Sequence, residues 1–63
     1  MNAKTTYQNT YQEIKTLQRE LTTLLIAHKQ EFDGENWGFV GDLTHIAVLL
    51  RETTAFLKNE DID

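Results

Sequence analysis

The sequence predicts an all-α fold, an antiparallel hairpin of two helices. Three observations lead to this prediction. Apolar residues recur at helical spacing in two long segments, no segment alternates apolar and polar residues with a period of two, and the three glycines of the chain fall in one short window near its middle. Since proline is absent, this window is where the helices are expected to be separated. The chain should therefore form two helices joined by one turn.

The first helix is expected from about residue 5 to about residue 32. Every seventh position from Tyr7 to His28 belongs to one series, namely Tyr7, Ile14, Leu21 and His28. Apolar residues stand three or four positions after most of these four, which is the pattern of a helix with one apolar side. We name this set the first apolar stripe; it comprises Tyr7, Tyr11, Ile14, Leu17, Leu21, Leu24, Leu25, His28 and Phe32.

The turn is expected at residues 33–36. Gly34 follows Asp33, and glycine adopts the left-handed backbone that ends a helix at little steric cost. Two residues could then cap the second helix, because Asn36 and Asp42 can both accept backbone N–H bonds. We favour Asn36, which would start the helix at Trp37 rather than at Leu43.

The second helix is expected over residues 37–58, followed by an acidic tail at residues 59–63 that frays. Gly38 and Gly41 are interpreted as removing side-chain bulk where the first turn passes close to the preceding helix, at a cost of about 1 kcal/mol of helix propensity each. The apolar positions form a second apolar stripe, flanked by Leu49 and Phe56; it comprises Val40, Leu43, Ile46, Ala47, Leu50, Thr53, Thr54 and Leu57.

A single domain over residues 1–63 is too small to stabilise itself with one hairpin, because short chains bury too little apolar surface. The sequence has no cysteine for a disulfide, and its two histidines are too few for a structural zinc site of its own. The second stripe is wider than one partner helix requires. We therefore expect a homodimer in which two hairpins form a four-helix bundle.

The net charge of the chain and the length of its apolar runs indicate where the protein is located and which partners are less favoured. The formal net charge is −4, and the acids gather between residues 31 and 42 and in the tail, which argues mildly against a general nucleic-acid binder. Residues 1–12 lack the apolar run of a signal peptide, and the longest apolar run, residues 46–50, is too short to cross a membrane. A cytoplasmic protein without membrane association is expected.

In length and plan the chain resembles the Rop family of plasmid-encoded helical hairpins, although it shares no sequence motif with them. The resemblance implies a four-helix dimer and, as one possible function, binding of paired RNA loops. Residues 37–45 also resemble a block that recurs in short bacterial and phage proteins without a known activity.

Few residues have the spacing of metal ligands or of catalytic groups. His28 with Glu31, and Asp42 with His45, have the three-residue spacing by which bundle helices present metal ligands. A histidine packed in the core is the favoured interpretation of His28, because such metal sites draw on more acids. No nucleophile has a plausible partner, so the chain is expected to be no enzyme and to hold no metal or cofactor.

Two surfaces are candidates for function. Trp37 and Phe39 stand among acidic and polar residues, where they either plug the end of the bundle, as we favour, or anchor a protein partner. The outward side of the first helix carries three bases and no acid, namely Lys15, Arg19 and Lys29. A protein-interaction or regulatory function is the leading hypothesis, and a Rop-like RNA or DNA binder that uses those bases is the alternative.

Overall fold

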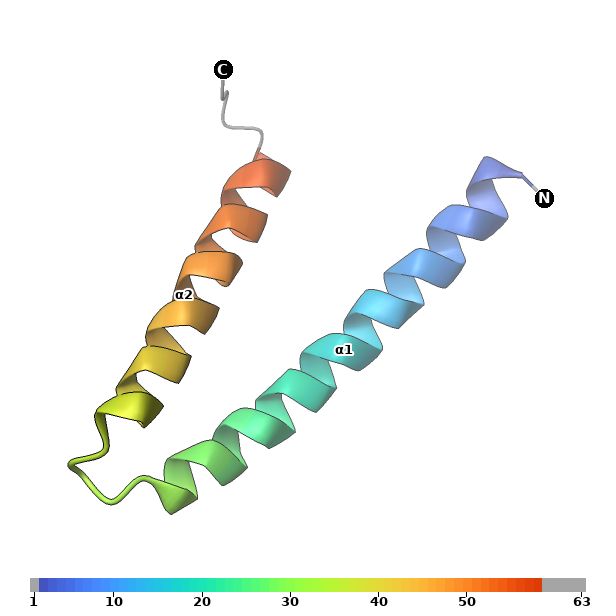
Figure 1. Cartoon of the computed structure of the whole chain (residues 1–63). Coiled ribbons are helices and arrows are strands. Elements are labelled where there is room, and N and C mark those ends of the chain that lie inside the picture. The colour runs from blue at the N-terminus through green and yellow to red at the C-terminus, as the bar shows by residue number, and fades with distance from the viewer. Residues whose placement is uncertain (1, 59–63) are drawn as a thin grey trace. The chain divides into compact units, whose positions relative to one another are not determined.

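A computed structural model of the chain describes residues 2–58. These residues form two α-helices and no strand: α1 spans Ala3–Glu31 and α2 spans Trp37–Lys58 (Figure 1). The prediction of an all-α chain with two helices is confirmed. The predicted acidic tail, residues 59–63, lies outside the described residues.

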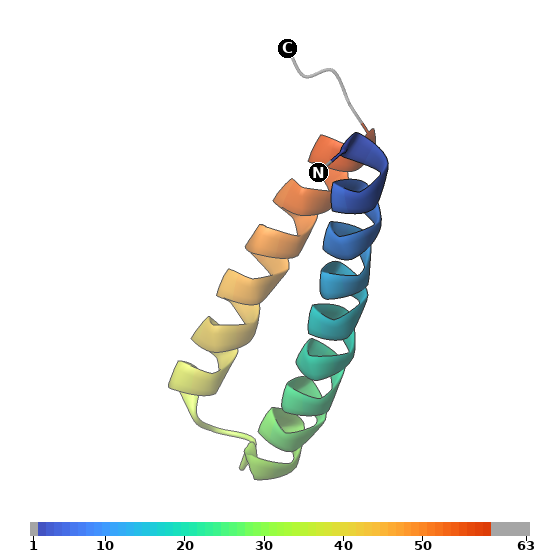
Figure 2. The same ribbon diagram turned by 90° about the vertical axis from the view of Figure 1, so that its right-hand side faces the viewer.

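The chain divides into two units, Met1–Glu31 and Phe32–Asp63. The first unit is built on α1, and the second on α2 together with the residues that lead into it. Each helix runs without a break in two perpendicular views (Figure 1, Figure 2). The predicted pairing of the two helices in a hairpin stays a prediction.

The start of α1 is set by Asn2. Its side-chain Oδ1 accepts a hydrogen bond of 2.8 Å from the backbone N–H of Thr5, and its carbonyl accepts one of 3.1 Å from the N–H of Thr6. This is the geometry of an N-cap, which satisfies a backbone donor that the first helical turn leaves unpaired. The helix therefore begins at Ala3, two residues before the position expected from the apolar stripe, which starts only at Tyr7.

The residues between the helices carry their own local hydrogen bonds. Gly34 has a φ of 91°, in the left-handed region that glycine adopts without strain, as its position predicted. The Asp33 carboxylate accepts bonds from the backbone N–H groups of Glu35, at 2.8 Å, and of Asn36, at 3.1 Å. Such a turn occupies backbone groups that would otherwise extend a helix, and α1 ends at Glu31 rather than at Phe32.

Asn36 caps α2. Its Oδ1 accepts hydrogen bonds from the backbone N–H of Gly38, at 2.8 Å, and of Phe39, at 3.3 Å, so two first-turn donors are satisfied by one side chain. The helix begins at Trp37, and Asp42 lies inside it. The alternative start at Leu43 is therefore wrong, because the stronger cap lies six residues earlier.

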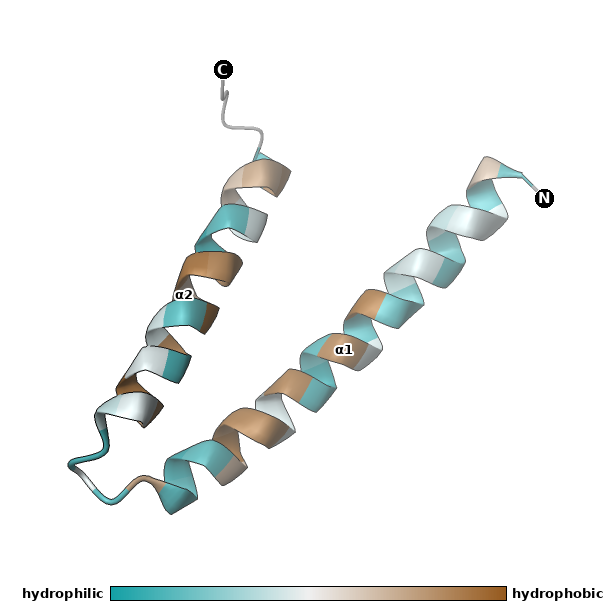
Figure 3. Ribbon diagram, viewed as in Figure 1, coloured by the Kyte–Doolittle hydropathy of each residue, from teal (hydrophilic) through white to brown (hydrophobic). Residues whose placement is uncertain are grey.

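None of the described residues is buried. The hydropathy colouring shows the apolar bands of α1 gathered in its middle and carboxyl-terminal parts, and those of α2 spread along most of its length (Figure 3). Most apolar side chains are exposed, and six residues are half-buried: Leu21, Leu25, His28, Phe39, Ile46 and Ala47. Neither helix can bury its own stripe, because helical side chains point outward from the backbone.

The two glycines of α2 differ in what surrounds them. A Cβ atom added at Gly38 would lie 3.0 Å from Oδ1 of Asn36, the atom that caps the helix. A Cβ atom added at Gly41 would meet no atom within 4 Å. The absence of a side chain at Gly38 thus makes room for the cap, a local reason that the sequence interpretation of close helix packing did not include.

This difference predicts opposite results for two alanine substitutions. Gly41→Ala should raise the free energy of unfolding by up to about 1 kcal/mol, because alanine is the better helix former and has open space. Gly38→Ala should give a smaller gain or a loss, because the cap oxygen must move. Thermal unfolding followed by circular dichroism measures both, and a lower melting temperature for Gly41→Ala would show that this side of α2 packs closely against a neighbour.

Candidate functional site

The first apolar stripe is largely in contact with solvent. Tyr7 is 70% exposed and Leu24 is 59% exposed. The rings of Tyr7 and Tyr11 stack on each other, with centroids 6.3 Å apart and an interplanar angle of 26°. The two rings add apolar surface to the stripe, and a tyrosine hydroxyl usually keeps a hydrogen-bond partner, such as water, when its ring is covered.

The second apolar stripe contains two threonines whose hydroxyls are already bonded. Thr53 Oγ1 donates to the carbonyl oxygen of Leu49 at 2.9 Å, and Thr54 Oγ1 donates to that of Leu50 at 2.8 Å. Because each hydroxyl has a partner within its own helix, covering this stripe leaves neither donor unsatisfied. The threonines therefore behave as part of an apolar surface, which the residue types alone do not show.

Phe39 and Trp37, predicted together as one candidate site, have different environments. Phe39 is half-buried and stacks on Phe32, with ring centroids 6.1 Å apart and an interplanar angle of 26°. Offset stacking of this kind adds about 0.5–1.5 kcal/mol to the burial of the rings. Phe39 thus packs against the residues that lead into α2, and its role there is structural.

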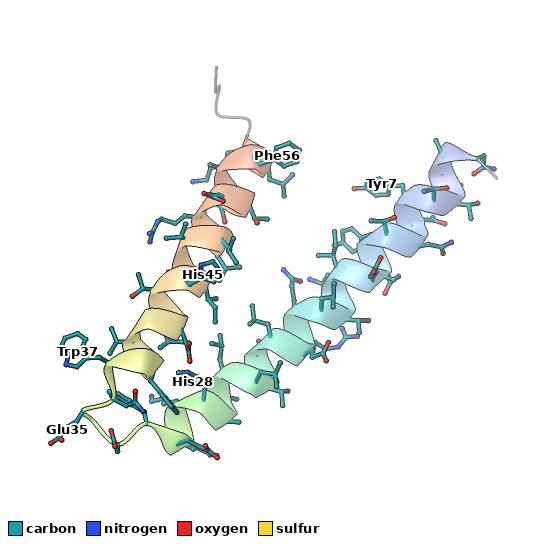
Figure 4. The ribbon with its side chains drawn as sticks, in the orientation of Figure 1. Tyr7, His28, Glu35, Trp37, His45 and Phe56 are labelled. Carbon is teal, nitrogen blue, oxygen red and sulfur yellow. The ribbon has the colours of Figure 1, made fainter. Side chains whose placement is uncertain are left out.

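Trp37 is 80% exposed, the highest value among the large apolar side chains of the described residues. Figure 4 shows its ring projecting away from the first turn of α2, on the side of the ribbon where the Glu35 side chain also projects. A tryptophan held by a capped helix turn, with its ring in solvent, has the character of a binding anchor.

The basic side of α1 is larger than the sequence predicted. At about 100° per residue, Lys15, Arg19 and Lys29 fall within an arc of about 80° on the helix. Because α1 begins at Ala3, Lys4 belongs to the helix and lies within the same arc. The sequence prediction left Lys4 out because it placed the start of the helix at Thr5. Asn2, the residue that caps α1, was the signal that would have placed Lys4 inside the helix. These four bases, all exposed, form what we call the basic face.

The acids of α1 occupy a different side of the helix. Glu13, Glu20 and Glu31 fall within about 20° of one another and about 150° from the centre of the basic face. On the basic face, Arg19 Nη2 donates a long hydrogen bond of 3.4 Å to Oγ1 of Thr16. The charges of α1 are therefore sorted by sign around the helix.

The histidine–carboxylate pairs lie one in each unit, His28 and Glu31 in the first and Asp42 and His45 in the second. Within residues 2–58, no three histidines or acids gather as a metal site requires. His28 is half-buried and takes part in an interaction within the chain. Neither described helix has the length and apolar character needed to span a membrane.

Comparison of the chain with protein-family models, with curated proteins and with solved structures gave no match.

The contrast between the two aromatic residues can be tested by stability. Phe39→Ala should lower the free energy of unfolding by about 1–3 kcal/mol, because it removes a half-buried ring that stacks on Phe32. Trp37→Ala should change it by no more than about 0.5 kcal/mol, because the ring is exposed. Urea unfolding measures both. An equal loss for the two variants would favour the other interpretation, in which Trp37 plugs the end of a bundle.

Proposed function

We propose that this chain is a non-enzymatic protein-interaction module of the cytoplasm, an antiparallel helical hairpin that pairs with a second copy to form a four-helix bundle. The observation that supports the proposal is the exposure of the apolar stripes: no described residue is buried, and large apolar side chains along both helices contact solvent. Helices of this length gain most of their stability in proteins from packing an apolar side rather than from propensity.

The bonded threonines lower the cost of such assembly. Thr53 and Thr54 keep their hydroxyl bonds to the backbone when water leaves the second stripe, so desolvation does not leave a buried donor unpaired. An unsatisfied hydroxyl would cost about 1–3 kcal/mol. The stripe is therefore suited to burial along its whole length, including its polar members.

Leu50 tests the assembly, because it lies in the middle of the second stripe. Sedimentation equilibrium of the wild type at micromolar concentration should give twice the chain mass. Leu50→Glu should dissociate and unfold the protein together, since a carboxylate cannot be buried in the stripe without a partner. Ile26→Glu is the matched control: Ile26 lies on the outward side of α1 and does not belong to the first apolar stripe, so this variant should stay dimeric. A stable folded monomer in the wild type would refute the bundle.

A second candidate function is nucleic-acid binding by the basic face. Four bases share one side of α1 with no acid among them, and a second copy doubles their number. Phosphate contacts from such a face would give affinity that falls steeply with salt. The acids near the linker oppose the approach of a polyanion, and for this reason the candidate ranks second.

Replacing Lys15, Arg19 and Lys29 by glutamine tests this candidate. The triple variant should keep the fold, because the three side chains are exposed and surface substitutions change stability by about 0.5 kcal/mol or less each. We expect the wild type to bind structured RNA and duplex DNA no more tightly than non-specific binders do at physiological salt. Submicromolar, salt-dependent binding that the triple variant loses would establish the second candidate in place of the first.

A further inference from the structure

Trp37 belongs to a second exposed side of α2, distinct from the second apolar stripe. At about 100° per residue, Trp37, Gly41, Thr44 and Val48 fall within an arc of about 60°. The centre of this arc is about 140° from the centre of the second apolar stripe. We name these four residues the Trp37 face.

The Trp37 face is open and lacks unsatisfied hydroxyls. Trp37 is 80% exposed and Val48 is 37% exposed. A Cβ atom added at Gly41 would meet nothing within 4 Å, and Thr44 Oγ1 donates to the carbonyl oxygen of Val40 at 2.9 Å. Small residues next to a large ring leave room for a helix backbone to approach. The face can therefore be covered by an apolar segment without loss of a hydrogen bond.

The charges that surround Trp37 along the chain are acidic. Asp33, Glu35 and Asp42 are the charged residues of the second unit before Arg51, which follows Trp37 by 14 residues, or about 21 Å along the helix. The helix N-terminus contributes about half a positive charge, against the two carboxylates of Asp33 and Glu35, since Asp42 lies about 130° from the centre of the Trp37 face. Asp33 is held in place by its two bonds to backbone N–H groups. The field around the ring is therefore negative.

This field selects among the possible occupants of the face. A second copy would bring its own Asp33 and Glu35 toward the same two acids, and a nucleic acid or an anionic membrane would be repelled. A segment with lysine or arginine beside apolar residues would be attracted. Its cations could pair with the Glu35 carboxylate and lie over the exposed indole ring, an arrangement that adds about 0.5–2 kcal/mol in proteins.

We propose that the Trp37 face binds a basic amphipathic helix of another protein, with Trp37 as the apolar anchor and Glu35 as the charged contact. The inference rests on the proposed function as a protein-interaction module and names its partner by chemistry. It does not depend on the second apolar stripe, which lies on another side of α2 and serves assembly with a second copy.

The experiment uses Trp37 as its own probe, since it is the only tryptophan in the chain. The full chain is titrated with a synthetic helical peptide of leucine and lysine, and with a matched peptide in which glutamate replaces lysine. We expect the lysine peptide to shift the tryptophan emission to the blue with saturation, and rising salt to weaken the binding. The glutamate peptide should give no shift. Equal shifts with both peptides, or no shift with either, would overturn the proposal.

Three variants separate this surface from general attraction to an acidic protein. By calorimetry, Trp37→Ala should weaken binding of the lysine peptide at least tenfold, and Glu35→Gln should weaken it severalfold. Phe56→Ala is the matched control, because Phe56 is 79% exposed and lies near the other end of α2 (Figure 4), and it should bind as the wild type does. Equal losses for Phe56→Ala and Trp37→Ala would also overturn the proposal.

Two further measurements distinguish the other occupants. Emission of the free protein that shifts to the blue as protein concentration rises would show a second copy on the face. A shift with phosphatidylserine vesicles but not with the lysine peptide would show a membrane surface, and either result would refute a basic helix as the partner. Sedimentation of the same samples reports the dimer separately, so a monomer that still binds the lysine peptide would refute the bundle and leave this inference standing.

Discussion

The contact between water and the apolar stripes of α1 and α2 is the constraint on which the rest of this protein depends. A helix directs its side chains outward, so Leu24 or Leu50 can leave water only when another helix covers it. The chain has no disulfide that could stabilise it instead. Its stability therefore depends on packing between helices, which the proposed bundle would supply.

The ends of the helices depend on a different set of interactions, which need no packing. Asn2, Asp33 and Asn36 each use a side-chain oxygen to bind backbone N–H groups two or three residues further along the chain. These short-range bonds decide where α1 begins and where α2 begins. Because the cap at Asn36 also holds the first turn of α2, it positions Trp37 and Phe39 on different sides of that turn, so that one ring is exposed while the other stacks on Phe32.

Basic and acidic side chains are concentrated on different parts of the chain. The bases of α1 share one side of that helix, whereas the residues leading into α2 and its first turns carry Asp33, Glu35 and Asp42. A polyanion would be attracted to the basic face, and a basic peptide to the acids beside Trp37. The residues proposed for the two candidate ligand classes are therefore different, so each set can be substituted separately.

Periodicity and capping chemistry were sufficient to predict two helices, the two stripes, the turn at Gly34 and the favoured cap at Asn36, because these features depend on residues within about one helical turn of one another. The same local rules also apply to Asn2, whose side chain caps α1 before the first apolar residue and so places Lys4 inside the helix. What the sequence could not show is which apolar side chains stay exposed. Phe39 and Trp37 are both large aromatic residues and lie two positions apart in the chain. Only the three-dimensional arrangement decided that one stacks on Phe32 while the other faces solvent, because burial depends on which atoms approach in space rather than on which residues are close in the chain.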